Sequence, residues 1–192
     1  MPTEVVLPSR TYREQAKSLE ELLLVSDVCF TAELVRQEAD YWPAENPQIS
    51  VFSRFQVRVR DVFHGDLQPG SESVLMIAGG NVASVGDPSP GGSFRPQPGQ
   101  STVAVRYEDQ PFPQAGRVEF VCASRFEGWA ADIGQVYVPN PDGRFAVYGD
   151  RLAPLVPPQD SSPAVRSVLA SATLDTVAAA FRTAGARVEA HP

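Results

Sequence analysis

Hydrophobic and polar residues alternate most regularly between residues 51 and 62. Phe55, Val57 and Val59 are separated by single polar residues, so a strand would place them on one face and the intervening cations on the other. The β-branched residues favour a strand over a helix, and Gly65-Asp66 indicates a turn after it. The pattern predicts a long, half-buried antiparallel strand around which the other elements are arranged.

Shorter alternating or apolar runs predict further strands. The strand nearest in sequence, over residues 28–36, is expected to pair with the long strand as an antiparallel ribbon, with the proline-containing segment 41–47 as the connecting loop. Residues 79–100 are rich in Gly and Pro and are expected to form a long irregular loop. The other expected strands are 74–78, 102–107, 117–123, and the pair 136–138 and 145–147, joined as a hairpin by a turn at Asp142-Gly143.

Helices are expected near both ends of the chain. Ser18 and Glu21 have the spacing of a capping box, which predicts a short helix from Ser18 to Val25 after an extended lead-in over residues 1–17. A helical tail is expected over about 162–186. Its expected features are Pro163 at the start of a first helical turn, Thr173 as N-cap of the main helix, an apolar face of Leu174, Val177, Ala178 and Phe181, and Gly185 as the stop.

Together these elements predict one mainly β domain over residues 18–192. A length of 192 residues with 43% hydrophobic residues suits a single globular domain with its own core. The expected fold is a closed or partly closed antiparallel barrel of five or six strands, with a short N-terminal helix and a C-terminal helix that covers an open end of the barrel. A sandwich of two sheets is the alternative architecture.

The charge balance disfavours a nucleic-acid or anionic-membrane partner. The formal net charge is -7, whereas binding to phosphate groups depends on clustered cations. No apolar run approaches the roughly 18 residues that span a bilayer, and residues 1–17 lack the apolar core of a signal peptide. We therefore expect a soluble protein, either cytoplasmic as the sequence stands or exported after removal of a signal.

The two cysteines are expected to be separate thiols. Cys29 is out of phase with the apolar row of its strand, whereas Cys122 is in phase with the apolar residues Val118 and Phe120 of its own strand. This predicts that they point to different faces, and a disulfide between them is the alternative. Their spacing does not suit a zinc site, so neither a metal nor a cofactor is predicted.

No catalytic set is evident in the sequence. His64 and His191 are the only histidines, and His64 lies at a turn between Asp61 and Asp66, where solvated side chains are the expectation. The G-x-S-x-G motif of serine hydrolases and the glycine patterns of phosphate-binding loops are absent. A metal- or carboxylate-dependent hydrolase that uses the His64 turn is kept as an alternative function.

The candidate ligand-binding residues are cations, an aromatic residue and an amide. Arg54, Arg58 and Arg60 form a row on one face of the long strand, where they would pair with carboxylates on a neighbouring strand, such as Glu33, or with an acidic partner. Trp42 belongs to an aromatic cluster that either covers the core or binds a ligand. Asn81 lies in the 79–100 loop, which is the expected recognition surface.

Five short motifs occur in an order that is similar to a known group of proteins. They comprise residues 18–27, residues 57–67, the pair Gly79-Gly80, residues 111–117 and residues 142–145. This order resembles that in uncharacterised bacterial proteins with an oligonucleotide/oligosaccharide-binding-like (OB-like) β-barrel, which are often exported. The resemblance implies the fold and export, and it supplies no catalytic residues.

The sequence thus favours a non-catalytic binding or protein-interaction module whose partner is another protein or a small ligand. Besides the hydrolase, a single-stranded nucleic-acid or oligosaccharide binder is a second alternative, because barrels of this kind bind such ligands.

Overall fold

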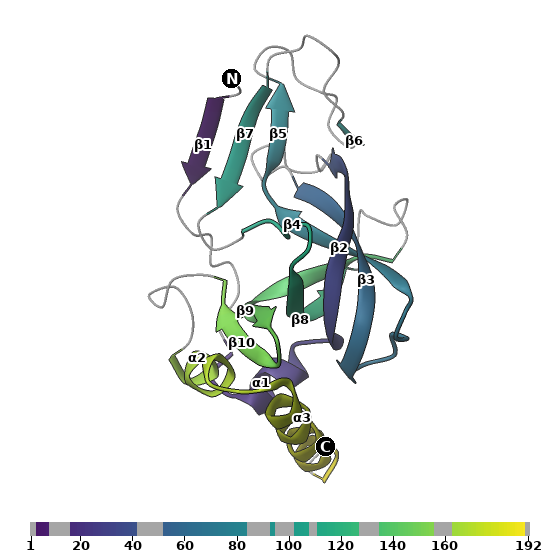
Figure 1. The fold of residues 1–192 in the computed structure, drawn as a ribbon, viewed down its shortest axis with the longest axis vertical. Helices are drawn as coiled ribbons and strands as arrows, with labels where there is room; N and C mark the ends of the chain where they lie inside the picture. Colours follow the sequence, from purple (N-terminus) through teal and green to yellow (C-terminus); the bar gives the residue numbers. More distant parts are fainter. Residues whose placement is uncertain are drawn as a thin grey trace.

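The fold is that of a computed structural model, which describes residues 3–7, 16–41, 52–83, 93–94, 102–107, 111–126, 135–155 and 163–190. A barrel lies in the middle of the molecule, a small three-stranded sheet at one end and the helices at the other (Figure 1). The marks for the N- and C-termini lie at these opposite ends.

The barrel is a closed ring of five strands. Going round the ring, β2 pairs with β3, β3 with β4, β4 with β9, β9 with β8, and β8 with β2. All pairs are antiparallel except β4 and β9, which pair in parallel at Leu75 and Tyr137. A mainly β barrel is therefore confirmed, but it is mixed rather than purely antiparallel. The strands are β2 (Val28–Tyr41), β3 (Phe52–His64), β4 (Glu72–Ala78), β8 (Val118–Arg125) and β9 (Tyr137–Tyr148).

The long strand predicted from the alternating pattern is β3. It pairs with β2 as the expected antiparallel ribbon, and Glu33 of β2 lies opposite Arg58. Phe55, Val57 and Val59 are buried in an inner cluster that fills the barrel. Burial of such a row removes apolar surface from water at roughly 25 cal/mol per Å², which explains why the period-two pattern was informative.

Strand β8 is buried on both faces. Val121 and Ala123 belong to the inner cluster, whereas the alternate residues Phe120 and Cys122 belong to a second, outer cluster on the other side of the strand. β8 is thus the layer between the barrel interior and the helices.

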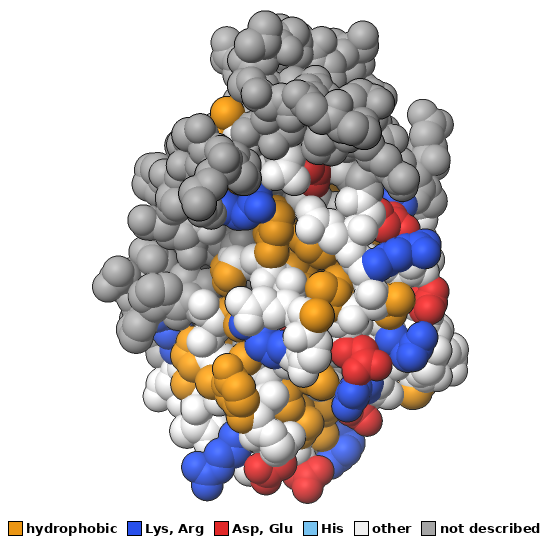
Figure 2. All heavy atoms as spheres, turned by 45° about the horizontal axis from the view of Figure 1, so that its top comes forward, with side chains coloured by type: hydrophobic (Ala, Val, Ile, Leu, Met, Phe, Trp, Pro, Cys, Tyr) orange, Lys and Arg blue, Asp and Glu red, His pale blue; other side chains and the backbone are white. Residues whose placement is uncertain are grey.

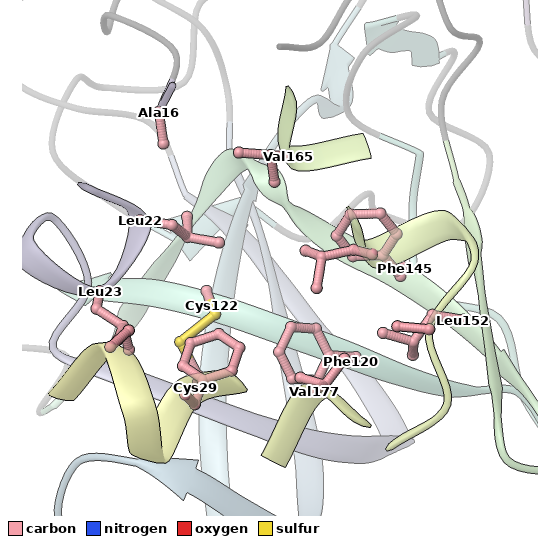
Figure 3. Close-up of a cluster of buried hydrophobic side chains, with 14 residues drawn as sticks. Ala16, Leu22, Leu23, Cys29, Phe120, Cys122, Phe145, Leu152, Val165 and Val177 are labelled. Atoms are coloured by element: carbon pink, nitrogen blue, oxygen red, sulfur yellow. A yellow bond between two sulfur atoms is a disulfide. The ribbon is translucent and has the colours of Figure 1, made fainter. Parts of the chain in front are cut away.

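The helices pack on the outer side of the barrel. α1 (Leu19–Leu24), α2 (Pro163–Ala170) and α3 (Leu174–Ala190) contribute buried side chains to the outer cluster (Figure 3). Phe181 of α3 lies against Phe120 with 5.9 Å between ring centroids. The C-terminal helix was expected to cover an open end of the barrel, but it covers the outer face of β2, β8 and β9, because these strands have apolar residues on both faces.

The N-caps of α1 and α3 agree with the sequence, and the end of α3 does not. Ser18 Oγ accepts a hydrogen bond from Glu21 N at 3.1 Å, and Thr173 Oγ1 accepts one from Thr176 N at 3.2 Å, as N-caps do. Gly185 was expected to stop the last helix, but α3 continues to Ala190.

The prediction of two separate thiols was wrong, because Cys29 and Cys122 form a disulfide. The two residues lie directly opposite each other in the β2–β8 pair, and both are fully buried in the outer cluster (Figure 3). Cys29 is out of phase with the inner row of β2, so it faces outward. Cys122 is in phase with Phe120, and both residues belong to the outer cluster. Because apolar residues lie on both faces of β8, the phase of Cys122 within the strand did not show which way its side chain points.

The predicted final hairpin was also wrong. β9 runs through Asp142-Gly143 as one strand, and its register with β8 jumps from Val121–Arg144 to Ala123–Pro139. The extra residues of β9 form an irregularity where the strand passes close to its neighbour. A Cβ on Gly143 would lie 2.6 Å from the carbonyl oxygen of Cys122, so the glycine permits close approach rather than a turn.

Further strands extend the barrel at both ends. β1 (Thr3–Leu7), β7 (Thr102–Tyr107) and β5 (Gly80–Ala83) form the three-stranded sheet, and β10 (Arg151–Pro154) pairs with the end of β9. The expected irregular loop over 79–100 therefore contains a strand, β5, and the two-residue β6 (Ser93–Phe94), which pairs with β2. No helix within the described residues is long and apolar enough to cross a membrane.

The disulfide closes a loop with a sequence separation of 93 residues. A Cys29→Ala, Cys122→Ala double variant should unfold with a free energy lower by about 4–5 kcal/mol, because the cross-link restricts the unfolded chain. Urea unfolding of the oxidised protein, of the reduced protein and of the double variant measures this difference. Equal stability of the oxidised and reduced proteins would show that the cross-link has no such effect.

Candidate functional site

Alternating charges cover the outer face of β2, β3 and β4, which we call the ion-pair face. Arg54 Nη2 lies 3.1 Å from Glu38 Oε2, and Arg58 Nη2 lies 3.6 Å from Glu72 Oε1. The face consists of Glu33, Arg36, Glu38, Arg54, Gln56, Arg58, Arg60 and Glu72.

Pairing within the sheet was predicted for the arginine row, and it is confirmed. Arg60 pairs with Glu33, as the sequence suggested. The side chains of Arg58 and Arg60 are 52% and 51% exposed, whereas that of Arg54 is 19% exposed. Exposed pairs of this kind contribute only about 0–1 kcal/mol each to stability, so the outer members of the row remain available to a partner.

Asn81 and Trp42 are not brought together with the arginine row. The backbone N–H and the side-chain amide of Asn81 donate to Asp40 Oδ2 at 2.8 and 3.2 Å. Ser53 Oγ lies 2.5 Å from Asp40 Oδ1, so buried Asp40 joins β2, β3 and β5. This contact gives Asn81 a structural role, its role in binding a ligand stays a prediction, and Trp42 lies outside the described residues.

A buried carboxylate between two arginines lies near the start of β8. Glu119 Oε2 accepts from Arg144 Nη2 at 2.5 Å, and Glu119 Oε1 accepts from Arg117 Nη2 at 2.7 Å. The side chains of Glu119 and Arg144 are only 5% and 4% exposed. Our sequence analysis missed this cluster, although a single carboxylate within the otherwise apolar run 118–123 was a signal for it.

The two arginines also hold the segment 111–117, which we call the cap segment. Arg144 Nη1 donates to the carbonyl of Pro111 at 2.6 Å, and Arg117 Nη2 donates to that of Phe112 at 3.4 Å. The ring of Phe112 packs edge-on against Phe55 of the inner cluster, with 4.9 Å between centroids. The Arg106 guanidinium carbon lies 4.4 Å from the centre of the Phe112 ring, which adds a cation–π contact.

The carboxylates beside His64 contact residues other than the histidine. Asp61 Oδ2 accepts from Thr31 Oγ1 at 2.8 Å, and Asp66 Oδ2 lies 3.4 Å from Arg125 Nη2. Among the described residues, no group of three or more His, Cys, Asp or Glu side chains is placed to hold a metal ion. His191 lies outside the described residues.

Arg125 has the one resolved pKa shift in the described part of the chain. A hydrogen bond with the Tyr137 hydroxyl is the main cause, and it raises the pKa of Arg125 further above its ordinary value. The amide of Gln135 completes the cluster: with its oxygen turned inward, it accepts from the Tyr137 hydroxyl at 2.9 Å and from Arg125 Nε at 2.9 Å. A guanidinium that is always protonated binds anions and does not transfer protons, so Arg125 itself supplies no acid or base.

Comparison with known protein families, with curated proteins and with solved structures finds no match for this chain. Its ion-pair face, cap segment and Arg125 cluster are therefore interpreted from their own geometry.

Glu119→Gln should lower the free energy of unfolding by about 3–5 kcal/mol, because it leaves buried Arg144 without a counter-charge. Urea denaturation at neutral pH measures the change. Glu72→Gln is the matched control, since Glu72 is 44% exposed and pairs with exposed Arg58; its effect should stay within about 1 kcal/mol. Similar losses in the two variants would contradict a special role for the buried cluster.

Proposed function

We propose that the protein is a non-catalytic protein-binding module built on an OB-like barrel, with the ion-pair face as its contact surface. The order of the barrel strands supports this proposal. If the five strands are counted along the chain, the first pairs with the second and the fourth, and the third pairs with the fifth in parallel. The OB fold is likewise a five-stranded Greek-key barrel.

The position of the ion-pair face supports its role in recognition. OB barrels bind their ligands on the face of the second and third strands, which here are β3 and β4. The helices pack against the outer cluster, which draws on β2, β8 and β9, and they leave Arg36, Arg58 and Arg60 of the ion-pair face exposed. On the side where Figure 1 shows β3, Figure 2 shows cationic and anionic side chains interspersed, without a large area of one sign.

The charge pattern favours a protein partner over a nucleic acid. Arg54, Arg58 and Arg60 each have a carboxylate partner, and the four arginines of the face are offset by three glutamates, so the surplus is a single cation. Binding to phosphates depends on clustered, unneutralised cations. Among the described residues, no aromatic side chain stands between these arginines to stack on bases, as single-stranded nucleic-acid binders require. Interspersed charges instead suit a folded partner with complementary charges, because they fix the register of the contact.

A photo-crosslinking amino acid at Arg58 should form a discrete covalent adduct with a partner protein in cells of the source organism. The same amino acid at Arg182, an exposed residue of α3, is the control and should give no such adduct. Denaturing electrophoresis and mass spectrometry identify the products. Equal labelling from both positions, or none at Arg58, would contradict the proposed surface. Salt-dependent binding of a fluorescent single-stranded oligonucleotide would support the nucleic-acid alternative instead.

We further propose that the module works in an oxidising compartment, outside the cytoplasm. The buried Cys29–Cys122 disulfide supports this, because disulfides persist in secreted proteins and are rare in a reducing cytosol. The bond lies beneath the helices with no exposed sulfur, so a structural role suits it better than redox chemistry.

Trapping of thiols in intact cells tests the compartment. Acid quenching followed by alkylation under denaturing conditions should leave both cysteines unmodified unless a reductant is added first. The Cys29→Ala variant is the control, because its single remaining Cys122 should react without reduction. Alkylation of both cysteines in the unreduced native protein would place it in a reducing compartment.

A further inference from the structure

The strand β1 is attached to the molecule through one neighbour. It lies at the edge of the three-stranded sheet and, among the described strands, pairs with β7 alone. The ladder is parallel and covers its whole length, from Thr3 opposite Val103 to Leu7 opposite Tyr107. A sequence separation of 100 residues lies between the partners Val5 and Val105, so the docking site for β1 is made by a strand far from it in the sequence.

The chain after β1 is anchored elsewhere. Ala16 is buried in the outer cluster together with Leu22 and Leu23 of α1. Figure 1 places α1 at the helical end of the molecule and β1 in the sheet at the other end. We call residues 3–7 the arm: they pair with β7 at one end of the molecule, whereas Ala16, the next residue of the chain that the structure describes, belongs to the helical layer at the other.

We propose that this arm exchanges between two copies of the chain, so that β1 of each copy pairs with β7 of the other. A parallel ladder consists of backbone N–H and C=O groups that are the same in every copy, so β7 cannot distinguish its own arm from that of a second molecule. The exchanged dimer keeps the β1–β7 ladder of the closed monomer. The balance between them is therefore set by the protein concentration relative to the effective concentration of the tethered arm.

We assign the exchange to a second copy of the same chain because the segment that pairs with β7 is itself part of that chain. Its five residues already define a register with Val103 to Tyr107, and that register needs no foreign sequence. The exchange is independent of the ion-pair face, so a failure of either proposal leaves the other untouched.

Paired cysteine substitutions test the exchange in the full chain. Chains carrying Val5→Cys are mixed with chains of different tag mass carrying Val105→Cys, incubated and mildly oxidised. Neighbouring strands lie about 4.8 Å apart, which a disulfide spans, and the native cysteines are already bonded to each other. We expect a cross-linked heterodimer on non-reducing gels, with a yield that rises at least severalfold between micromolar and near-millimolar protein.

Two controls make the result decisive. Val5→Cys chains mixed with Arg182→Cys chains should give only background cross-linking, and the Val5→Cys, Val105→Cys double variant should cross-link within one chain in dilute solution. A double variant that closes within the chain, together with mixed single variants that never cross-link at any concentration, would overturn the exchange. Absence of the intrachain cross-link would overturn it too, because β1 would then not occupy the β7 edge.

Discussion

The pairing between β2 and β8 is the constraint on which the rest of the fold depends, because it closes the barrel. Strands β2, β3 and β4 are joined by sequential antiparallel pairing, and so are β8 and β9. Among the described strands, two pairings join these groups into a ring, and one of them, between β4 and β9, has a single registered pair. The other is β2–β8, with six registered pairs and the disulfide across it. Separation of β2 from β8 would expose the inner and the outer cluster together, because β8 lies between them.

The same strand also determines where the barrel accepts buried charge. Glu119 lies near the start of β8, where an isolated carboxylate would be strongly unfavourable in the protein interior. Arg117 and Arg144 neutralise it and use their remaining donors on the carbonyls of Phe112 and Pro111. The same two arginines therefore neutralise Glu119 and attach the cap segment, and this arrangement places Phe112 against the barrel interior.

Local patterns predicted the elements that have one buried face, and they failed where distant strands meet. Phe55, Val57 and Val59 alternate with exposed residues, so β3 could be predicted from its sequence. The cysteines could not be placed, since β8 is apolar on both faces and its phase does not tell which side faces the barrel. Gly143 was misread because a turn and a close contact between strands both need glycine, and only the position of Cys122 distinguishes them. Of the candidate site, the ion pairs of the arginine row were predictable from Glu33 and Arg60, whereas the Glu119 cluster depends on contacts across β9.

The ion-pair face differs energetically from these buried features, and this difference bears on its role. Buried Glu119 and Arg144 stabilise the fold only as a pair, so neither can change alone without a large loss of stability. The exposed pairs at Arg58 and Arg60 contribute little to folding, and ordering their long side chains opposes that contribution through lost rotamer entropy. Folding stability alone therefore does not account for concentrating paired charges on the outer face of β2, β3 and β4. The proposed recognition of a partner would account for it, since a surface whose residues are dispensable for folding can be adapted to a ligand without weakening the pairing of β2 with β8.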